Sequence, residues 1–308
     1  MSDLLQVILL GLIEGITEFL PISSTGHLLI AEHFGLGQRS DVFNVVIQAG
    51  AILAVVLIYR ARLWELASNF HKAENRDYSL KLVTAFLITS VCGFILVSKL
   101  HFKLPEELGP VAWALLIGGV WMIVAEWLAE WLDRSLPTLA HRVDNIEVQS
   151  AGLKAFWTAI SKLLAARKPD SVRITWIVAI AVGLAQVVAA VFPGSSRSAS
   201  TIFIAMLLGT SNRAAATEFA FLVGIPTMFA ASGYELLKAL KQGGASGENW
   251  TDLGIAFVVS TVTAFIAVKW LLGYIRSHRF TAFAIYRIIA GGALLVFLAR
   301  IPASAAGG

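Results

Sequence analysis

Long apolar stretches dominate this chain, and short polar segments interrupt them at intervals. The apolar runs lie at 42–59, 80–98, 110–132, 173–192, 214–237, 253–272 and 281–299. Each is close to the roughly 20 residues that a helix needs to cross the hydrocarbon core of a bilayer. The pattern therefore predicts an all-α polytopic membrane protein, and composition agrees, because 57% of the residues are hydrophobic and only 14% are charged.

Two stretches interrupt this pattern in the same way. Residues 11–30 read GLIEGITEFLPISSTGHLLI and residues 183–202 read GLAQVVAAVFPGSSRSASTI, so Gly-Leu, eight residues and Pro-x-Ser-Ser recur at an offset of 172. In each copy an apolar helix meets a proline, which disfavours helical geometry in the residue before it. The pattern predicts two re-entrant helical hairpins, which enter and leave the bilayer by the same face. Their arms are 3–20 with 26–36, and 173–192 with 198–209.

Each predicted hairpin precedes three full crossings, which indicates a duplicated unit. Because three is odd, the second unit must enter from the opposite face, and the repeat is predicted to be inverted. We expect one integral-membrane domain over 1–308, with a first inverted repeat (1–132), a cytoplasmic connector (133–172) and a second inverted repeat (173–300). Within the connector, residues 151–166 fit an interfacial amphipathic helix or a solvated segment lying on the membrane surface.

The distribution of basic residues gives an orientation. The formal charge is +4, but in a membrane protein the positions of Lys and Arg carry more information than their sum. Segment 133–173 carries seven basic residues and segments 60–81 and 269–280 are also rich in them, whereas 99–109 and 238–252 carry two each. The positive-inside rule makes the first three segments cytoplasmic and places the amino terminus outside.

The first hairpin carries two glutamates. Glu14 and Glu18 are four residues apart, so both carboxylates project from one helix face. Together with Arg197, three ionised groups at membrane depth would cost on the order of 10 kcal/mol. The pair must share a proton, bind a cation, or both, and a hard divalent ion, Mg²⁺ or Ca²⁺, held by carboxylates and phosphate oxygens meets this need. The alternative is a hydrated, idle pair at the external boundary.

Hydroxyl groups and a histidine follow these acids. Ser23, Ser24 and Thr25 come after Pro21 at the start of a new helix, where free backbone N–H groups and hydroxyls favour an anion. His27 is three residues beyond Ser24, within reach of its hydroxyl or of a water. Ordinary helix capping explains one serine of this set and leaves the others without a reason.

The second hairpin carries a glycine, three serines and an arginine. Gly194 permits close backbone approach, Ser195, Ser196 and Ser198 offer hydroxyls, and the planar fork of Arg197 can bind phosphate with two hydrogen bonds. The alternative for Arg197 is a structural salt bridge to a glutamate of the first hairpin. Broken helices of inverted repeats usually meet near the midplane, so we expect both tips to form one pocket.

Other polar residues in apolar runs are interpreted mainly as structural. Gln48 and Gln186 are candidates for lining the cavity, although hydrogen bonding between helices is favoured for both. The predicted ion pairs join Glu126 and Glu130 to Arg134, and Glu218 and Arg287 to each other or to Lys269.

The inventory suits phosphoryl transfer, in which positioning and charge neutralisation dominate. The nucleotide-binding pattern GxxxxGK[ST] and the zinc-protease pattern HExxH do not occur in the sequence. The single cysteine, Cys92, excludes a disulfide framework and a cysteine-based metal site. No nucleic-acid partner is expected.

Several motifs closely resemble the undecaprenyl-diphosphate phosphatases of bacteria, also called bacitracin-resistance proteins. They are EGITEFLPISSTGH, VFNVVIQAGAILAVV, PGSSRS, RAAATEFAFLVGIP and TAFAIYR, and the similarity extends from residue 3 to about 299. The resemblance implies hydrolysis of undecaprenyl diphosphate to undecaprenyl phosphate and inorganic phosphate with a divalent cation. It further implies recycling of the lipid carrier for peptidoglycan synthesis, bacitracin resistance, and a site that opens to the periplasmic face of the inner membrane.

By the same resemblance, the active-site positions are Glu14, Glu18, Ser23, Ser24, His27, Ser196 and Arg197. We expect the two glutamates to bind the cation. Arg197 and the Ser195–Ser196 region are expected to bind the phosphoryl group, and His27 to move a proton. Either Ser24 or a water attacks. Further predicted substrate contacts are Thr25, Gly194, Ser198 and Gln48. The chain departs from the family pattern at Ala199, where glycine is usual, and in a longer connector.

Two other functions share features with this sequence. A transporter shares the architecture of an inverted repeat with two broken hairpins. A second class of membrane phosphatase uses a distant arginine-histidine pair, but no histidine follows Arg197 within ten residues. The lipid substrate and membrane lipids are the expected partners, and whether the chain forms a homo-oligomer stays open.

Overall fold

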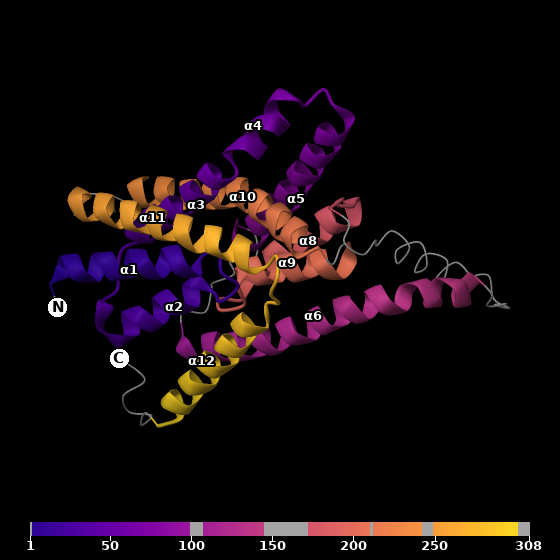
Figure 1. Ribbon diagram of the computed structural model, residues 1–308. Coiled ribbons are helices and arrows are strands. Elements are labelled where there is room, and N and C mark those ends of the chain that lie inside the picture. Colours follow the sequence, from indigo (N-terminus) through magenta and orange to yellow (C-terminus); the bar gives the residue numbers. More distant parts are fainter. Residues whose placement is uncertain (1, 99–106, 145–171, 210–211, 242–248, 301–308) are drawn as a thin grey trace.

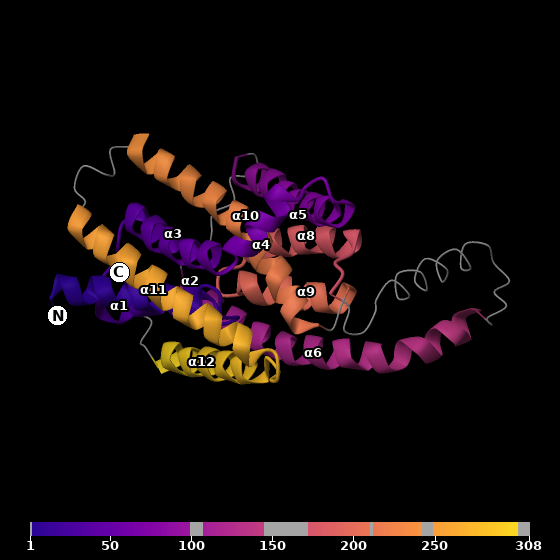
Figure 2. The ribbon, with the colours of Figure 1, turned by 45° about the horizontal axis from the view of Figure 1, so that its top comes forward.

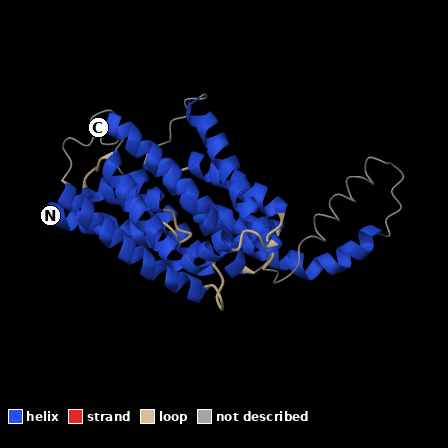
Figure 3. Ribbon diagram, turned by 90° about the horizontal axis from the view of Figure 1, so that it is seen from above, coloured by secondary structure: helices blue, strands red, loops and turns tan. Residues whose placement is uncertain are grey.

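The computed structural model describes residues 2–98, 107–144, 172–209, 212–241 and 249–300. All regular elements in these ranges are helices, as Figure 3 shows, which confirms the predicted all-α class. The first half contains α1 (Asp3–Thr17), α2 (Ser24–Ala31), the short η1 (Glu32–Leu36), α3 (Asp41–Ile58), α4 (Arg60–Ser68), α5 (Ala73–Ser98) and α6 (Leu108–Asp144). The second half contains α8 (Trp176–Val191), α9 (Arg197–Leu208), α10 (Arg213–Lys241), α11 (Trp250–Tyr274) and α12 (Thr281–Arg300).

Within the described ranges, six helices are long and apolar enough to cross a membrane: α3, α5, α6, α10, α11 and α12. This confirms the six predicted crossings. Helix α6 continues as far as Asp144, so the predicted end of the first unit at residue 132 falls inside a helix. The predicted amphipathic segment 151–166 lies outside the described residues.

The two interrupted motifs form helix pairs. Helix α1 folds back on α2, and α8 folds back on α9, with breaks at the predicted Pro-x-Ser-Ser sequences. Figures 1 and 2 show that the pairs approach from opposite ends of the molecule and that their tips meet in its middle. The start of α1, the end of α10 and the start of α11 lie at one end. Inversion of the repeat relative to a membrane, and the side that faces outward, stay predictions.

Each hairpin packs against a long helix of the other half. Helix α1 lies on α11, where a Cβ atom at Gly15 would come within 2.6 Å of the Ser260 carbonyl oxygen. Helix α8 lies on α5, where a Cβ atom at Gly183 would come within 2.8 Å of the Ala85 carbonyl oxygen. Glycines at these crossings let the backbones approach closely, as is common between membrane helices. This exchange between the halves fixes both tips in the centre.

The ion pairs of Glu126 and Glu130 match the predicted ones only in part, because Glu130 does pair with Arg134 but Glu126 does not. Glu126 pairs with Arg213 (Oε1 to Nε, 2.8 Å), and Glu130 pairs with Arg279 (Oε2 to NH2, 2.6 Å). Arg134 reaches only Glu130, at 3.8 Å. These partners come from α10 and the α11–α12 turn, so the cluster ties three helices together, which pairing with Arg134 on α6 alone would not do.

The prediction for Glu218 was also wrong, because this residue pairs with Arg62 of α4 at 3.4 Å and not with Arg287 or Lys269. Gln186 does bond between helices, since its Nε2 donates to Thr89 Oγ1 at 3.4 Å. Arg287 has a different role, described below.

Candidate active site

The two hairpin tips share an unusual backbone conformation. Ser23 is the N-cap of α2 with φ 77°, and Ser196 is the N-cap of α9 with φ 68°. These are the two described non-glycine residues with positive φ, a conformation that costs an L-residue about 1–2 kcal/mol. Each serine hydroxyl accepts a hydrogen bond from the third residue onward, Gly26 N at 3.4 Å and Ala199 N at 3.3 Å. Each tip is therefore a capped helix N-terminus, a position that favours anions in general.

The capping serines of the two tips do not align at the predicted offset of 172 residues, because Ser23 and Ser196 are one residue further apart. Pro21 lies two residues before the capping Ser23, whereas Pro193 lies three before Ser196, because Gly194 adds a residue at φ 90°. Ser24 therefore corresponds in position to Arg197. One tip presents a hydroxyl where the other presents a guanidinium.

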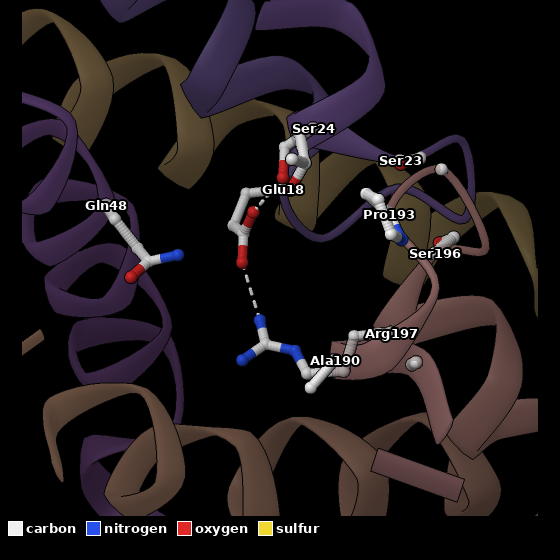
Figure 4. A pocket seen from close by; sticks show the side chains of 11 residues that line it. Glu18, Ser23, Ser24, Gln48, Ala190, Pro193, Ser196 and Arg197 are labelled. Atoms are coloured by element: carbon white, nitrogen blue, oxygen red, sulfur yellow. Dashed lines mark hydrogen bonds and ion pairs between the residues drawn. The ribbon is translucent and has the colours of Figure 1, made fainter. Parts of the chain in front are cut away.

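A three-residue contact joins the tips. Arg197 NH2 donates to Glu18 Oε1 at 2.5 Å, and the Ser24 hydroxyl donates to the other oxygen of the same carboxylate. Figure 4 shows Glu18 between the two partners. The salt bridge to a glutamate of the first hairpin, predicted as the alternative role of Arg197, is thus present. The Arg197 side chain is nevertheless 25% exposed. The guanidinium can pair with Glu18 and still face the cavity.

The cavity between the tips has a volume of about 190 Å³. Its wall contains eight of the predicted site residues: Glu18, Ser23, Ser24, Thr25, Gln48, Gly194, Ser196 and Arg197. Ala189, Ala190 and Pro193 complete it. The predicted pocket of acids, hydroxyls, histidine and arginine thus contains one of the two glutamates, the hydroxyls and Arg197, whereas Glu14 and His27 lie outside its wall.

Gln48 has both of the functions considered for it. Its side-chain oxygen accepts a hydrogen bond from Ser232 of α10 at 2.8 Å, and the amide points into the cavity. Ser198 and Ser195 lie outside the cavity wall. The Ser198 hydroxyl donates to the Leu20 carbonyl at 3.1 Å, and the Ser195 hydroxyl donates to the Ala189 carbonyl at 3.4 Å. Ser198 therefore ties the second tip to the first.

Glu14 is buried one turn before Glu18 and is not part of the cavity wall. Its Oε2 atom is buried with no hydrogen-bond partner among the described residues. A buried carboxylate in this position needs a proton or a cation. Among the described residues no group of three or more His, Cys, Asp or Glu side chains could hold a metal ion, so a cation here would use the two glutamates with oxygens from substrate or water. Two neighbouring carboxylates, one with a free oxygen, fit such an ion.

His27 lies elsewhere than expected. Its Nδ1 is 2.6 Å from the Ser23 carbonyl oxygen and its Nε2 is 2.7 Å from the Tyr286 hydroxyl, with the two rings stacked. Because a carbonyl only accepts, Nδ1 carries a proton and donates it to the Ser23 carbonyl, while Nε2 is hydrogen-bonded to the Tyr286 hydroxyl. His27 is not part of the cavity wall, so the structure does not bring it to the Ser24 hydroxyl.

One site residue was assigned the wrong environment from sequence. Arg287 of α12 is fully buried and donates to carbonyl groups of both tips. An arginine within an apolar span signals function by default. Its partners are backbone carbonyl groups, however, and these cannot be identified from residue types in the sequence.

The fold and the site define a class, a multi-pass helical membrane protein with a polar site between two helical hairpins. A model of the family described as bacitracin resistance protein BacA matches residues 7–293. The chain is 60% identical over 293 residues to an undecaprenyl-diphosphatase of Rhizobium etli, with 95% of this chain and 96% of the relative covered. It is 57% identical over 305 residues to an undecaprenyl-diphosphatase of Xanthomonas euvesicatoria pv. vesicatoria, with 99% and 100% covered. This chain belongs to the bacitracin resistance protein BacA family, which confirms the predicted resemblance.

Proposed function

We propose that this chain is a membrane phosphatase that hydrolyses undecaprenyl diphosphate to undecaprenyl phosphate and inorganic phosphate. The observation that carries the proposal is the contact of Ser24, Glu18 and Arg197 at the junction of the tips. A hydroxyl, a carboxylate and a guanidinium at one cavity support the proposal, because phosphoryl transfer needs a nucleophile, a proton acceptor and a cation that binds phosphate. The names of the 57–60% identical relatives support the same substrate.

Recognition of the diphosphate rests on positive groups from both halves. Helices α2 and α9 begin at the cavity, so the positive ends of their dipoles and their first N–H groups favour phosphate oxygens. Arg197 adds a full charge and two parallel donors. When a phosphoryl group takes these donors, Glu18 loses its partner and becomes free to accept a proton or to hold a cation.

Glu14 and Glu18 would hold the divalent cation, Mg²⁺ or Ca²⁺. When bound, such an ion neutralises charge on the diphosphate and so favours attack on it. The free Oε2 of Glu14 is the feature of this chain that such an ion would satisfy. Without the ion, Glu14 would need a proton to stay buried.

Glu18 is positioned as the proton acceptor for the nucleophile. In one route the Ser24 hydroxyl attacks the terminal phosphorus, its proton passes to Glu18, undecaprenyl phosphate leaves, and water then hydrolyses the phosphoserine. In the other route a water beside Ser24 gives its proton to Glu18 and attacks directly. His27 remains a proposed proton carrier, and to reach the leaving oxygen its ring would have to turn away from Ser23 and Tyr286.

The remaining parts of the proposal follow from this activity. Regenerated undecaprenyl phosphate would serve peptidoglycan synthesis again, and removal of the diphosphate form would protect against bacitracin. The site is proposed to open to the periplasmic face of the bacterial inner membrane. The lipid chain would lie between apolar helices, so a water-soluble diphosphate should be a poor substrate.

The test is phosphate release from undecaprenyl diphosphate by the purified chain in detergent. Hydrolysis should be lost in Glu18→Gln and in Arg197→Ala. Glu235→Gln is the matched control, because that carboxylate forms an exposed salt bridge with Lys238 away from the cavity. Wild-type protein that moves the lipid across a membrane without releasing phosphate would favour the transporter instead.

A further inference from the structure

Arg287 contacts four backbone carbonyls on three segments. Its NH1 donates to Pro21 O at 3.3 Å in the first tip, and its NH2 donates to Gly194 O at 2.9 Å in the second. The same guanidinium donates to Ala114 O at 3.0 Å and to Leu115 O at 3.4 Å on α6. One side chain from α12 therefore holds both tips against the same helix.

Arg287 forms no salt bridge with any residue in the described part of the chain, unlike Arg39, Arg62, Arg134, Arg197, Arg213 and Arg279, which all pair with carboxylates. The side chain has 0% exposure. A buried guanidinium that meets only carbonyl dipoles keeps most of its field, because little water or counter-charge screens it. Gly194, which accepts its hydrogen bond, lies in the cavity wall. A positive charge thus lies directly behind the proposed phosphate site.

Helix α6 is shaped to admit this side chain. A Cβ atom at Gly118 would lie 2.0 Å from Arg287 NH2, a distance at which the guanidinium would have to move. Gly109 on the same helix has no neighbour within 4 Å of the corresponding position. Arg287 can therefore adopt this position only because residue 118 is a glycine.

We propose that Arg287 is a positioning residue that locks the two tips in register and whose charge raises the affinity of the cavity for the anionic head group. The proposal rests on the proposed function. The hydrogen bonds of Arg287 to the two tips set the geometry between Ser24, Glu18 and Arg197, and kcat depends on that geometry. The positive charge of Arg287 attracts the bound diphosphate at longer range, so KM depends on the charge.

The experiment compares Arg287→Met, Arg287→Lys and Gly118→Ala with the matched control Gly109→Ala. Amide hydrogen exchange is measured in segments 18–26 and 192–199, alongside kcat and KM for undecaprenyl diphosphate. Arg287→Met and Gly118→Ala should speed exchange in both tips and lower kcat about 100-fold, since misplacement by about 1 Å has that effect. Arg287→Lys keeps the charge but not the fork, so it should recover KM more than kcat. Gly109→Ala should match the wild type.

Unchanged exchange at both tips in Gly118→Ala and Arg287→Met, or a change at only one tip, would overturn the lock. Equal KM in Arg287→Lys and Arg287→Met would overturn the contribution of charge. Arg213→Met is a control for the general effect of removing an arginine from this protein. Arg213 is half-buried, pairs with Glu126 and contacts neither tip, so exchange at the tips should not change. If Arg287→Met does not fold, Gly118→Ala and Arg287→Lys still decide. Wild-type protein that releases no phosphate would defeat the proposed function, while the exchange data would still judge the lock.

Discussion

The two hairpin tips have nearly the same backbone and opposite chemistry. Ser23 and Ser196 cap their helices with φ of 77° and 68° and ψ of 99° and 107°. The next residue is Ser24 in one tip and Arg197 in the other. The first tip adds Glu14 in the preceding helix and Glu18 at its C-cap, whereas α8 has no acidic residue.

This difference shows how two tips with nearly the same backbone can line one composite cavity. The shared backbone supplies two helix starts that favour an anion, and the side chains divide the remaining work. Both tips carry hydroxyls, but the carboxylates lie with the first tip and the guanidinium on the second, so the charged groups at the cavity come from both. The predictions below disturb one tip at a time, or exchange what the two carry.

The largest effect is expected from exchanging the charged partners. In Glu18→Arg/Arg197→Glu the ion pair between the tips can form again, but the acid no longer lies beside Ser24 and Glu14. Hydrolysis should fall at least about 1,000-fold, as in the single variants, because preorganised charge at such a site is worth that much. Phosphate release measures it. Recovery of activity in the double variant would show that the pair is only structural.

The serines of the two tips should differ in importance. Ser24 touches Glu18 in the cavity, whereas Ser195 lies outside its wall and bonds weakly to Ala189. Ser24→Ala should lower kcat about 100-fold or more, and Ser195→Ala only a few-fold. Trapping of a phosphoserine on Ser24 would favour direct attack, and retention of most of the rate in Ser24→Ala would rule that route out. Equal losses in both variants would contradict the asymmetry.

The first tip should also control the dependence on cation. Chelation should stop hydrolysis, and Glu14→Gln should raise the half-saturating concentration of Mg²⁺ or Ca²⁺ about tenfold or more, because one ligand loses its charge. A titration of rate against cation concentration measures this. Asp252→Asn serves as the control, because this carboxylate lies in the first turn of α11 and is not part of the cavity wall. An unchanged titration in Glu14→Gln would contradict the cation site.

The smallest effects concern the strained caps. Ser23→Gly and Ser196→Gly relieve positive φ but lose the hydroxyl cap, so stability should change by less than about 1 kcal/mol. Ser23→Val and Ser196→Val should each destabilise by about 2 kcal/mol or more, because a β-branched residue tolerates positive φ poorly. Thermal unfolding in detergent compares them. Valine variants as stable as the glycine variants would show that the two tips are not held in this conformation.

Much of the fold could be predicted from local patterns. Six apolar helices follow from run length, and the two breaks follow from proline and the serines, because those signals act within a few residues. Seven of the eight predicted cavity residues followed from these breaks, since both tips carry polar groups that lipid would not tolerate, and Gln48 of α3 followed from its place in an apolar run.

The pairing of groups across helices could not be predicted in the same way. Glu126 pairs with Arg213 and not Arg134, and Arg287 binds carbonyls and not Glu218. Such partners depend on how helices cross, and backbone carbonyls are present at every residue. His27 illustrates the same limit, because its ring turned toward Tyr286, a residue 259 positions away.

The most direct test of the central claim is an experimental structure with a non-hydrolysable polyprenyl diphosphate analogue and Mn²⁺, whose anomalous signal locates the ion. The account predicts the terminal phosphonate on Arg197 and Ser196, the ion between that group and the carboxylates of Glu14 and Glu18, and both tips around one ligand. A head group bound away from the tips, or an ion that touches neither glutamate, would contradict it.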